Sequence, residues 1–402
     1  MTAPQKIEGG TVTMPEGFLA GAVHAGIRYN PNKPDLGLLY SERPCVAAAV
    51  YTANAVKAAP LLVTMEHLAD GRAQGLVVNS GCANAATGSR GLEDARRMAQ
   101  LAAQHMGISP KDVVVASTGV IGTFLPMDKV AKAIASISLT RTGGKDLAMA
   151  IMTTDTRPKY GAYALGPYCL GAVAKGAGMI HPNLATMLCF ITTDAPVAQP
   201  FLQEALKEAV DSSFNMIDVD SDTSTNDMVV VMANGEGPPI DDDHPLGQPF
   251  RQALSALCQD MARALVADAE GAGKVIEMTV EGAVSLAEAR RAAREVVRSL
   301  GVKTAIKGAD PNWGRVVAAL GNSGCRLELG SLALWLLDPQ GDHICFFLGG
   351  HPQPFDDRRA KALLSEPVVR LRAHLGLGEA HATAWGSDLT EDYVRLNSLY
   401  TT

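Results

Sequence analysis

The chain has 402 residues, of which 47% are hydrophobic and 19% are charged. Such a chain buries one large core or two modest ones, as a globular enzyme does, and its composition excludes a disordered protein. Its net charge is −7, with lysines and arginines scattered rather than clustered, which excludes the basic surface of a nucleic-acid-binding protein.

The first ten residues are polar and lack the apolar core of a signal peptide. No stretch of the sequence reaches the ~18 consecutive apolar residues that a membrane helix requires. The 7 cysteines lie far apart and never form a Cys-x-x-Cys pair, so the sequence offers neither a disulfide framework nor a zinc site. We therefore expect a cytoplasmic protein with reduced thiols, no metal and no membrane partner.

Hydrophobic periodicity predicts the elements of the first part of the chain. Runs of β-branched residues that end in Gly or Asn predict buried strands over 75–79, 112–119 and 227–235. Apolar residues at three- and four-residue spacing predict amphipathic helices over 92–106, 201–213 and 250–269. Because all three strands end in turn residues, we expect their loops to lie at a common rim.

The last part of the chain predicts a second, smaller lobe from about residue 275 to 402. A strand is predicted over 274–281, and the capping-box spacing of Ser285 and Glu288 predicts a helix from there to about Leu300. The sequence has no repeat and no long linker, so the two lobes should pack closely. The predicted fold class is mixed α/β, layered as α+β.

The segment 174–191 carries the chemistry. A lysine and three small residues lead through His-Pro-Asn into an apolar run that starts beside Thr186. The simplest interpretation of Thr186 is a β-branched residue in a strand. In the other interpretation, Thr186 attacks the carbonyl of a strained Ala185–Thr186 peptide and the chain is cut, so that Thr186 gains a free α-amino group as its base.

A family resemblance favours cleavage. Residues 175–188 resemble the hallmark block of the ornithine acetyltransferases, Lys-Gly-small-Gly-Met-Ile followed by Pro-Asn-x-Ala-Thr-Met-Leu. Further blocks that resemble this family follow in the same order, at 79–85, 117–122, 222–227, 310–315 and 384–390. The resemblance implies a self-cleaving, N-terminal-nucleophile-like fold in which an α chain (1–185) and a β chain (186–402) form one intertwined catalytic unit, assembled as an α2β2 heterotetramer.

The same resemblance implies the reaction. The family moves an acetyl group from N2-acetyl-L-ornithine to L-glutamate in arginine biosynthesis, as a glutamate N-acetyltransferase that carries the acetyl group on Thr186. This cycle requires no cofactor. The sequence leaves open whether acetyl-CoA is a second donor, which would also make the enzyme an amino-acid N-acetyltransferase.

The predicted oxyanion hole is Thr118 with Gly119, which match the family there and end the predicted strand 112–119. Without the resemblance, an ordinary strand-ending turn is the better interpretation. Lys175 matches a substrate-binding lysine and supplies a cation for a carboxylate. Thr153 matches another substrate contact, although a capping cluster at a helix end would look the same and Thr154 is its alternative.

The remaining substrate contacts implied by the family lie late in the chain. Glu270 matches an acidic position and would hold the ornithine amine; Ala269 stands before it where the family usually has Gly. Asn397 and the terminal Thr402 match the last two contacts, which requires a chain end that is held in place. His181 needs no direct role if the free amine is the base.

Three smaller questions complete the prediction. The acidic run 222–227 lacks calcium-loop spacing, so we expect a turn whose Thr and Asn side chains bond the backbone near the site. Among enzymes, the alternative is an N-terminal-nucleophile amidase or aminopeptidase, which would release acetate without needing glutamate. A non-catalytic binding protein that never cleaves is the alternative from another class.

Overall fold

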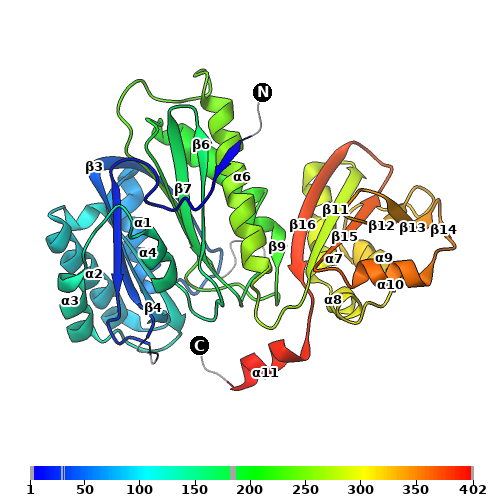
Figure 1. Cartoon of the computed structure of the whole chain (residues 1–402), viewed down its shortest axis with the longest axis horizontal. Coiled ribbons are helices and arrows are strands. Elements are labelled where there is room, and N and C mark those ends of the chain that lie inside the picture. The colour runs from blue at the N-terminus through cyan, green and yellow to red at the C-terminus, as the bar shows by residue number, and fades with distance from the viewer. Residues whose placement is uncertain (1–3, 29, 31, 182–186, 400–402) are drawn as a thin grey trace.

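A computed structural model describes residues 4–28, 30, 32–181 and 187–399, and these form two β-sheets with helices packed on them (Figure 1). The first sheet consists of β1 (Gln5–Ile7), β2 (Phe18–Val23), β3 (Leu36–Tyr51), β4 (Arg72–Cys82), β5 (Val113–Val120), β6 (Lys159–Leu165), β7 (Tyr168–Lys175), β8 (Leu188–Thr193) and β10 (Met228–Ala233). The second sheet consists of β9 (Ile217–Asp218), β11 (Val275–Ala283), β12 (Ala333–Leu337), β13 (His343–Leu348), β14 (His351–Pro352), β15 (Val368–His374) and β16 (Ala380–Ser387). The helices are α1 (Ala59–His67), α2 (Gly88–Met106), α3 (Met127–Ser136), α4 (Gly144–Ala150), α5 (Gln199–Asp211), α6 (Gly247–Val266), α7 (Leu286–Arg298), α8 (Leu300–Lys307), α9 (Trp313–Asn322), α10 (Asp357–Leu364) and α11 (Glu391–Leu399). The predicted mixed α/β class is confirmed.

The first sheet folds into two layers because β3 takes part in both. Its first half pairs with β2 and β4, its second half pairs with β10, and the pairing with β4 shifts register between Tyr40 and Cys45. Side chains of β4 and β5 pack with those of β7, β8 and β10 in one buried cluster between the layers. The layering brings the end of β5 close to the beginnings of β8 and β10.

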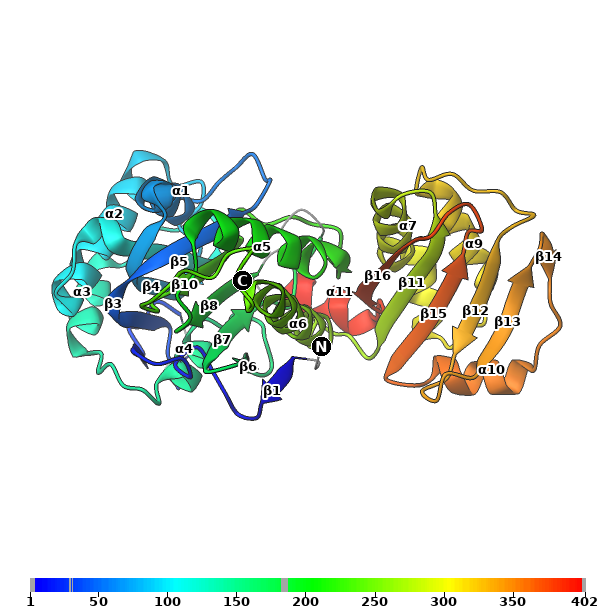
Figure 2. The ribbon, with the colours of Figure 1, turned by 90° about the horizontal axis from the view of Figure 1, so that it is seen from above.

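Helices cover both outer faces of these layers. Residues of α1, α2 and α3 pack against β4 and β5, and residues of α5 and α6 pack against β7, β8 and β10. Figure 2 shows these helices on opposite sides of the strands. Buried small and apolar residues face the sheet from each helix, since the polar residues of an amphipathic helix stay in water.

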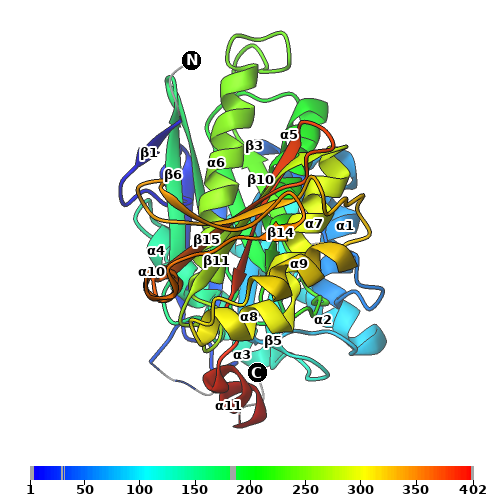
Figure 3. The same ribbon diagram turned by 90° about the vertical axis from the view of Figure 1, so that its right-hand side faces the viewer.

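The second sheet has the strand order β14-β13-β12-β15-β11-β16-β9. Its last strand, β9, comes from the segment after α5 and pairs in parallel with β16. Helices α7, α8 and α9 lie on one side of this sheet (Figure 3). The buried cluster under α5 and α6 continues into this sheet, so the two sheets are joined through a common core.

Most predicted elements are present with shifted ends. The strands predicted at 75–79 and 112–119 are β4 and β5. The helices predicted at 92–106, 201–213 and 250–269 are α2, α5 and α6. The capping box is confirmed, because the Ser285 hydroxyl accepts a hydrogen bond from the Glu288 N–H at 3.3 Å. The helix ends at Arg298, since Ser299 leaves helical geometry and caps α8.

The expectation of a common rim for all three strand ends is wrong for β10. Asn234, just after β10, donates to Ser41 and to the carbonyl of Glu16, at the bend of β3. The beginning of β10 lies near the end of β5 instead, because Asn226 donates to the Ser117 carbonyl. A strand pattern gives the residues of a strand but not the direction in which the strand enters the sheet.

Within the ranges that the structure describes, no helix combines the length and apolar character needed to cross a membrane.

Candidate active site

Lys175 and Thr118 meet in the interior between the two layers. Lys175 is the last residue of β7, and its Nζ donates to the Thr118 Oγ1 at 2.9 Å. Both residues are buried, with 2% of Lys175 and 4% of Thr118 exposed to solvent. Two predicted site residues that are 57 positions apart are therefore in direct contact.

Gly119 follows Thr118 at a position that only glycine tolerates. Its φ is +129°, and a Cβ atom there would lie 2.4 Å from the carbonyl carbon of Gly81. Parallel pairing of β4 with β5 sets this close approach of two backbones. Glycine at 119 therefore lets β5 approach β4 closely beside Thr118.

The Lys175 amine is surrounded by carboxylates. Burial lowers the pKa of Lys175, and the charges of Asp155, Asp227 and Glu270 oppose this shift without cancelling it. Asp227 shows the reverse: burial raises its pKa well above the ordinary range, against hydrogen bonds from Met187 and Ser224 and the Lys175 charge. The Lys175 amine thus lies in a buried cluster of acidic side chains, where burial and charge act on its pKa in opposite directions.

Asp227 and Asn226 fix the start of β8 and the end of β5. Asp227 Oδ1 accepts from the Met187 N–H at 2.9 Å, and its Oδ2 has no hydrogen-bond partner among the described residues. Asn226 Nδ2 donates to the carbonyls of Ala83 and Ser117 at 2.7 and 2.8 Å. The prediction of a turn that bonds the backbone near the site is confirmed for Asn226, whereas the hydroxyl of Thr225 donates to the Asn226 side chain.

Glu270 and Asn397 also meet. Asn397 Nδ2 donates to Glu270 Oε2 at 2.8 Å, and the Glu270 N–H donates to the Ala177 carbonyl at 2.9 Å. A Cβ on Gly178 would lie 2.6 Å from the Glu270 carboxylate, so glycine at 178 lets this side chain approach the loop after β7. The acid predicted to hold an amine thus lies beside the loop that follows Lys175.

The C-terminal helix α11 is held in place, as the prediction for Asn397 requires. Thr390 Oγ1 donates to the Gly271 carbonyl at 2.6 Å, and Tyr393 Oη bonds Asp220 at 3.3 Å. Gly271 has a φ of +66°, and a Cβ there would lie 2.4 Å from the Tyr393 nitrogen. These contacts dock α11 against the segment that follows α6.

Thr153 is connected to the loop after β7 through Asp155. Its N–H donates to Asp155 Oδ2 at 2.9 Å, while Asp155 Oδ1 accepts from the Gly176 N–H at 2.8 Å. Asp155 therefore links Thr153 to the residue after Lys175.

Ala185, Thr186 and Thr402 lie outside the described residues. Their predicted roles in cleavage, nucleophilic attack and substrate binding remain predictions. Met187, to which Thr186 is joined, is tied to Asp227 as described above.

His181 has a partner other than the predicted nucleophile. Its Nδ1 lies 2.9 Å from Asp218 Oδ2, and the buried Lys303 lies 3.2 Å from Asp218 Oδ1. Lys303 also donates to the carbonyls of Asp218 and Ser387. His181 is thus oriented through the strand pair β9–β16 of the second sheet.

Comparisons with known proteins decide the family. The sequence model of the ArgJ family matches residues 19–402. The arginine biosynthesis bifunctional protein ArgJ of Symbiobacterium thermophilum is 50% identical over 402 residues, covering 98% of this chain and 99% of that protein. The chain belongs to the ArgJ family.

Two solved structures are also similar in sequence to this ArgJ chain. One is the bifunctional protein ArgJ of Bacillus halodurans, 42% identical, covering 52% of this chain and 97% of that chain with a TM-score of 0.49. The other is an ornithine acetyltransferase of Mycobacterium tuberculosis complexed with ornithine, 39% identical, covering 45% of this chain and 98% of that chain with a TM-score of 0.43. The predictions of the ornithine acetyltransferase family and of an acyltransferase in arginine biosynthesis are confirmed by the family match, which does not favour the hydrolase alternative.

Sequence reasoning missed two charged residues beside the ArgJ site. The sequence motifs predict only a turn around Asp227 and give no role to Lys159 at the start of β6. A lone lysine or aspartate is usually solvated, so only the tertiary structure reveals that each is buried here. No local sequence signal separates these two buried charges from solvated ones.

Asp220 gives the ArgJ chain a pH-dependent contact near the site. Burial raises its pKa to about 6, against hydrogen bonds from Met179, Ile180 and Asp222, while Asp218 raises it further. A carboxyl group with a raised pKa stabilises the fold fully below about pH 4, and this contribution is lost as the pH rises through about 6.

We therefore expect the melting temperature of the wild-type protein to fall, relative to that of Asp220→Asn, as the pH rises from 4.5 to 7. The rise in the Asp220 pKa to about 6 corresponds to a change of roughly 2–3 kcal/mol in the free energy of unfolding. Calorimetry of both proteins across this range measures the difference. Parallel curves for the two proteins would show that Asp220 does not titrate in this way.

Proposed function

We propose that this chain transfers an acetyl group from N2-acetyl-L-ornithine to L-glutamate through an acetyl ester on Thr186. The observation that carries this proposal is the buried contact between Lys175 and Thr118, beside the strand that Thr186 precedes. It joins a cation suited to a substrate carboxylate with a hydroxyl suited to an oxyanion. The family names and the ornithine-bound structure of a relative support the choice of substrates.

The proposed cycle starts with self-cleavage. The Thr186 hydroxyl attacks the Ala185 carbonyl, the peptide C–N bond breaks to give an ester and a free α-amine, and water hydrolyses the ester. The products are an α chain of residues 1–185 and a β chain of residues 186–402, which we propose stay intertwined and pair as α2β2. The new α-amine is then the base for its own hydroxyl.

Acetyl transfer follows in two balanced halves. The Thr186 oxygen attacks the acetyl carbonyl of acetylornithine as its proton passes to the α-amine, and Thr118 with the Gly119 N–H stabilises the oxyanion. The C–N bond breaks and ornithine leaves with that proton. The glutamate α-amine attacks the ester, the C–O bond to Thr186 breaks, and one proton of the glutamate amine passes through the Thr186 α-amine to the Thr186 oxygen.

Substrate contacts divide between carboxylate and amine in this scheme. Lys175 and Thr153 hold the amino-acid end, and Glu270 with Asn397 receives the side-chain ammonium of ornithine; Thr402 completes the pocket. No cofactor enters the cycle. Because the curated relatives are named bifunctional, we propose acetyl-CoA as a second donor whose thioester carbonyl is attacked by the same oxygen.

Isotope tracing tests this function. With acetylornithine labelled in its acetyl group, we expect label to appear in N-acetylglutamate, with one ornithine released per transfer and little free acetate. The matched control omits glutamate and should leave most of the label in acetylornithine. Rapid release of labelled acetate in that control would establish the amidase alternative instead.

A further inference from the structure

A fully buried lysine bridges two carboxylates behind the candidate site. Lys159 Nζ lies 2.5 Å from Asp155 Oδ1 and 2.6 Å from Asp268 Oδ2, and only 1%, 0% and 4% of the three side chains are exposed. A further contact joins Nζ to the Arg157 carbonyl at 3.5 Å. Because the amine has three donors, these contacts occupy it within the protein and leave none for a substrate.

Each carboxylate also holds a segment of the site. Asp155 accepts from Gly176, next to Lys175, and Asp268 precedes Glu270 by two residues at the end of α6. Asp268 additionally accepts from the N–H of Thr156 at 3.1 Å and from its hydroxyl.

These contacts close a ring. It runs from Lys159 through Asp155 to Gly176, and the Ala177 carbonyl then accepts from the Glu270 N–H at 2.9 Å. From Glu270 the backbone returns to Asp268 and so to the lysine. Three segments that are distant in sequence, 155–159, 176–177 and 268–270, are thereby fixed relative to one another.

A contribution to stability is a weak explanation for a buried lysine between two carboxylates. Buried ion pairs lose their hydration, and well-packed apolar residues often serve a fold equally well or better. The directional contacts of an ammonium with two carboxylates instead set distances that apolar packing does not specify.

We propose that Lys159 is a positioning residue for acetyl transfer, which, by bridging Asp155 and Asp268, sets the separation between Lys175 and Glu270 to the length of the ornithine substrate. This inference rests on the proposed function of those two residues. Lys159 itself does not touch the substrate.

The bridge also sets the charge around Lys175. Asp155, Asp227 and Glu270 raise the pKa of the Lys175 amine, whereas Lys159 and burial lower it. Removing the Asp155 charge therefore lowers the pKa of Lys175 further, so the cation is lost at a lower pH. Asp155→Asn should therefore move the alkaline limb of kcat/KM to lower pH.

The main test compares Lys159→Met and Asp268→Asn with the wild-type enzyme, with the melting temperature recorded for each. Misplaced binding groups should raise KM for acetylornithine roughly tenfold or more in both variants, because small misplacements are costly in a preorganised site. KM for glutamate, which lacks the side-chain amine that Glu270 receives, should rise less. A purely structural lysine would lower the melting temperature without this difference between the two substrates.

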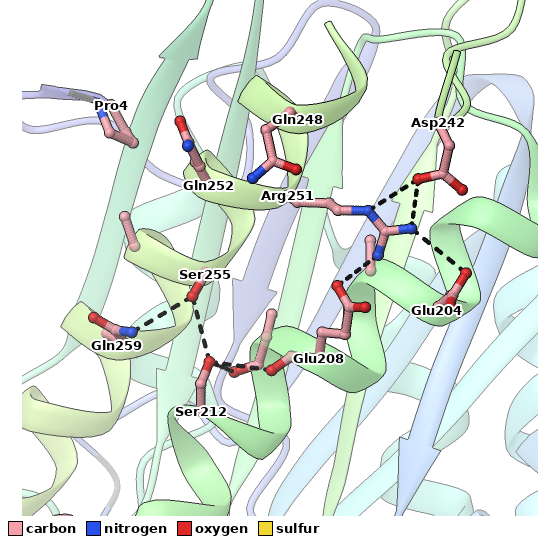
Figure 4. A pocket seen from close by; sticks show the side chains of 13 residues that line it. Pro4, Glu204, Glu208, Ser212, Asp242, Gln248, Arg251, Gln252, Ser255 and Gln259 are labelled. Carbon is pink, nitrogen blue, oxygen red and sulfur yellow. Dashed lines mark hydrogen bonds and ion pairs between the residues drawn. The ribbon is translucent and has the colours of Figure 1, made fainter. Parts of the chain in front are cut away.

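Arg251 offers a matched control near the other end of α6. Its guanidinium contacts Glu208, Asp242 and Glu204 in a hollow of about 760 Å³ between α5 and α6 (Figure 4). Among the predicted site residues that the structure describes, none lines this hollow. Arg251→Met should lower the melting temperature and leave both KM values unchanged.

The outcomes separate the two proposals. Wild-type enzyme that transfers no acetyl group contradicts the proposed function. Active wild-type enzyme with unchanged KM values in folded Lys159→Met, or in Asp268→Asn if the first variant does not fold, overturns only the positioning role. If the alkaline limb of the kcat/KM profile lies at the same pH in Asp155→Asn as in the wild-type enzyme, this inference is also contradicted.

Discussion

Replacing Thr186 with alanine should leave one unbroken chain and lower acetyl transfer by roughly 10⁴–10⁶-fold, the loss seen when a covalent nucleophile is removed from an enzyme. The substitution removes the hydroxyl that would cut the Ala185–Thr186 bond and also the base that cleavage would create. Intact-mass analysis measures cleavage, and the labelled-acetyl assay measures transfer. Wild-type protein should give two fragments that meet at this bond.

Thr193→Ala, at the end of β8, is the matched control. Thr193 is fully buried, and its hydroxyl donates to the Cys169 carbonyl at 2.8 Å, far along β8 from Met187. Its loss should reduce stability while the chain still cleaves and transfers acetyl. If Thr186→Ala is still cut, or if it transfers acetyl at the wild-type rate, the mechanism proposed above is wrong.

Replacing Thr118 with valine should reduce kcat by roughly 10²–10³-fold, the effect of losing one oxyanion donor. Valine keeps the shape of threonine and removes only the hydroxyl that contacts Lys175. Because the oxyanion forms only in the transition state, KM for both substrates should change much less than kcat. Steady-state kinetics with acetylornithine and glutamate provide the measurement.

Thr64→Val is the control for this substitution. Thr64 is fully buried on α1, and its hydroxyl both donates to the Val115 carbonyl and accepts from the Val115 N–H at 2.7 Å. The same chemical change on a neighbouring part of β5 should destabilise the protein and leave kcat intact. A kcat for Thr118→Val within tenfold of wild type would remove Thr118 from the oxyanion hole.

The candidate site shows which inferences the sequence supports. The family blocks point to Thr118, Lys175 and Glu270, and the structure brings the first two into contact and places the third beside the same loop. The family blocks do not include Lys159. Nothing in the sequence around it distinguishes a buried lysine that binds two carboxylates from a solvated one. The Asp227 carboxylate was likewise hidden within a turn motif.

The fold shows the same division. Amphipathic periodicity predicted α2 and α6, and the capping box at Ser285 predicted the start of α7, because helix formation depends on residues three and four positions apart. Nothing local predicted that β3 would join two layers, or that β9 would cross to the second sheet. Strand partners are chosen by contacts between distant segments.

The sequence by itself determined the family, the expected nucleophile and the position of most elements, since these depend on motifs and on short-range spacing. Only the tertiary structure decided which end of β10 faces the site, that Lys159 is buried between two carboxylates, and that α11 docks near Glu270. Burial and long-range hydrogen bonds arise when distant segments pack together, so a residue's neighbours in sequence do not specify its neighbours in space.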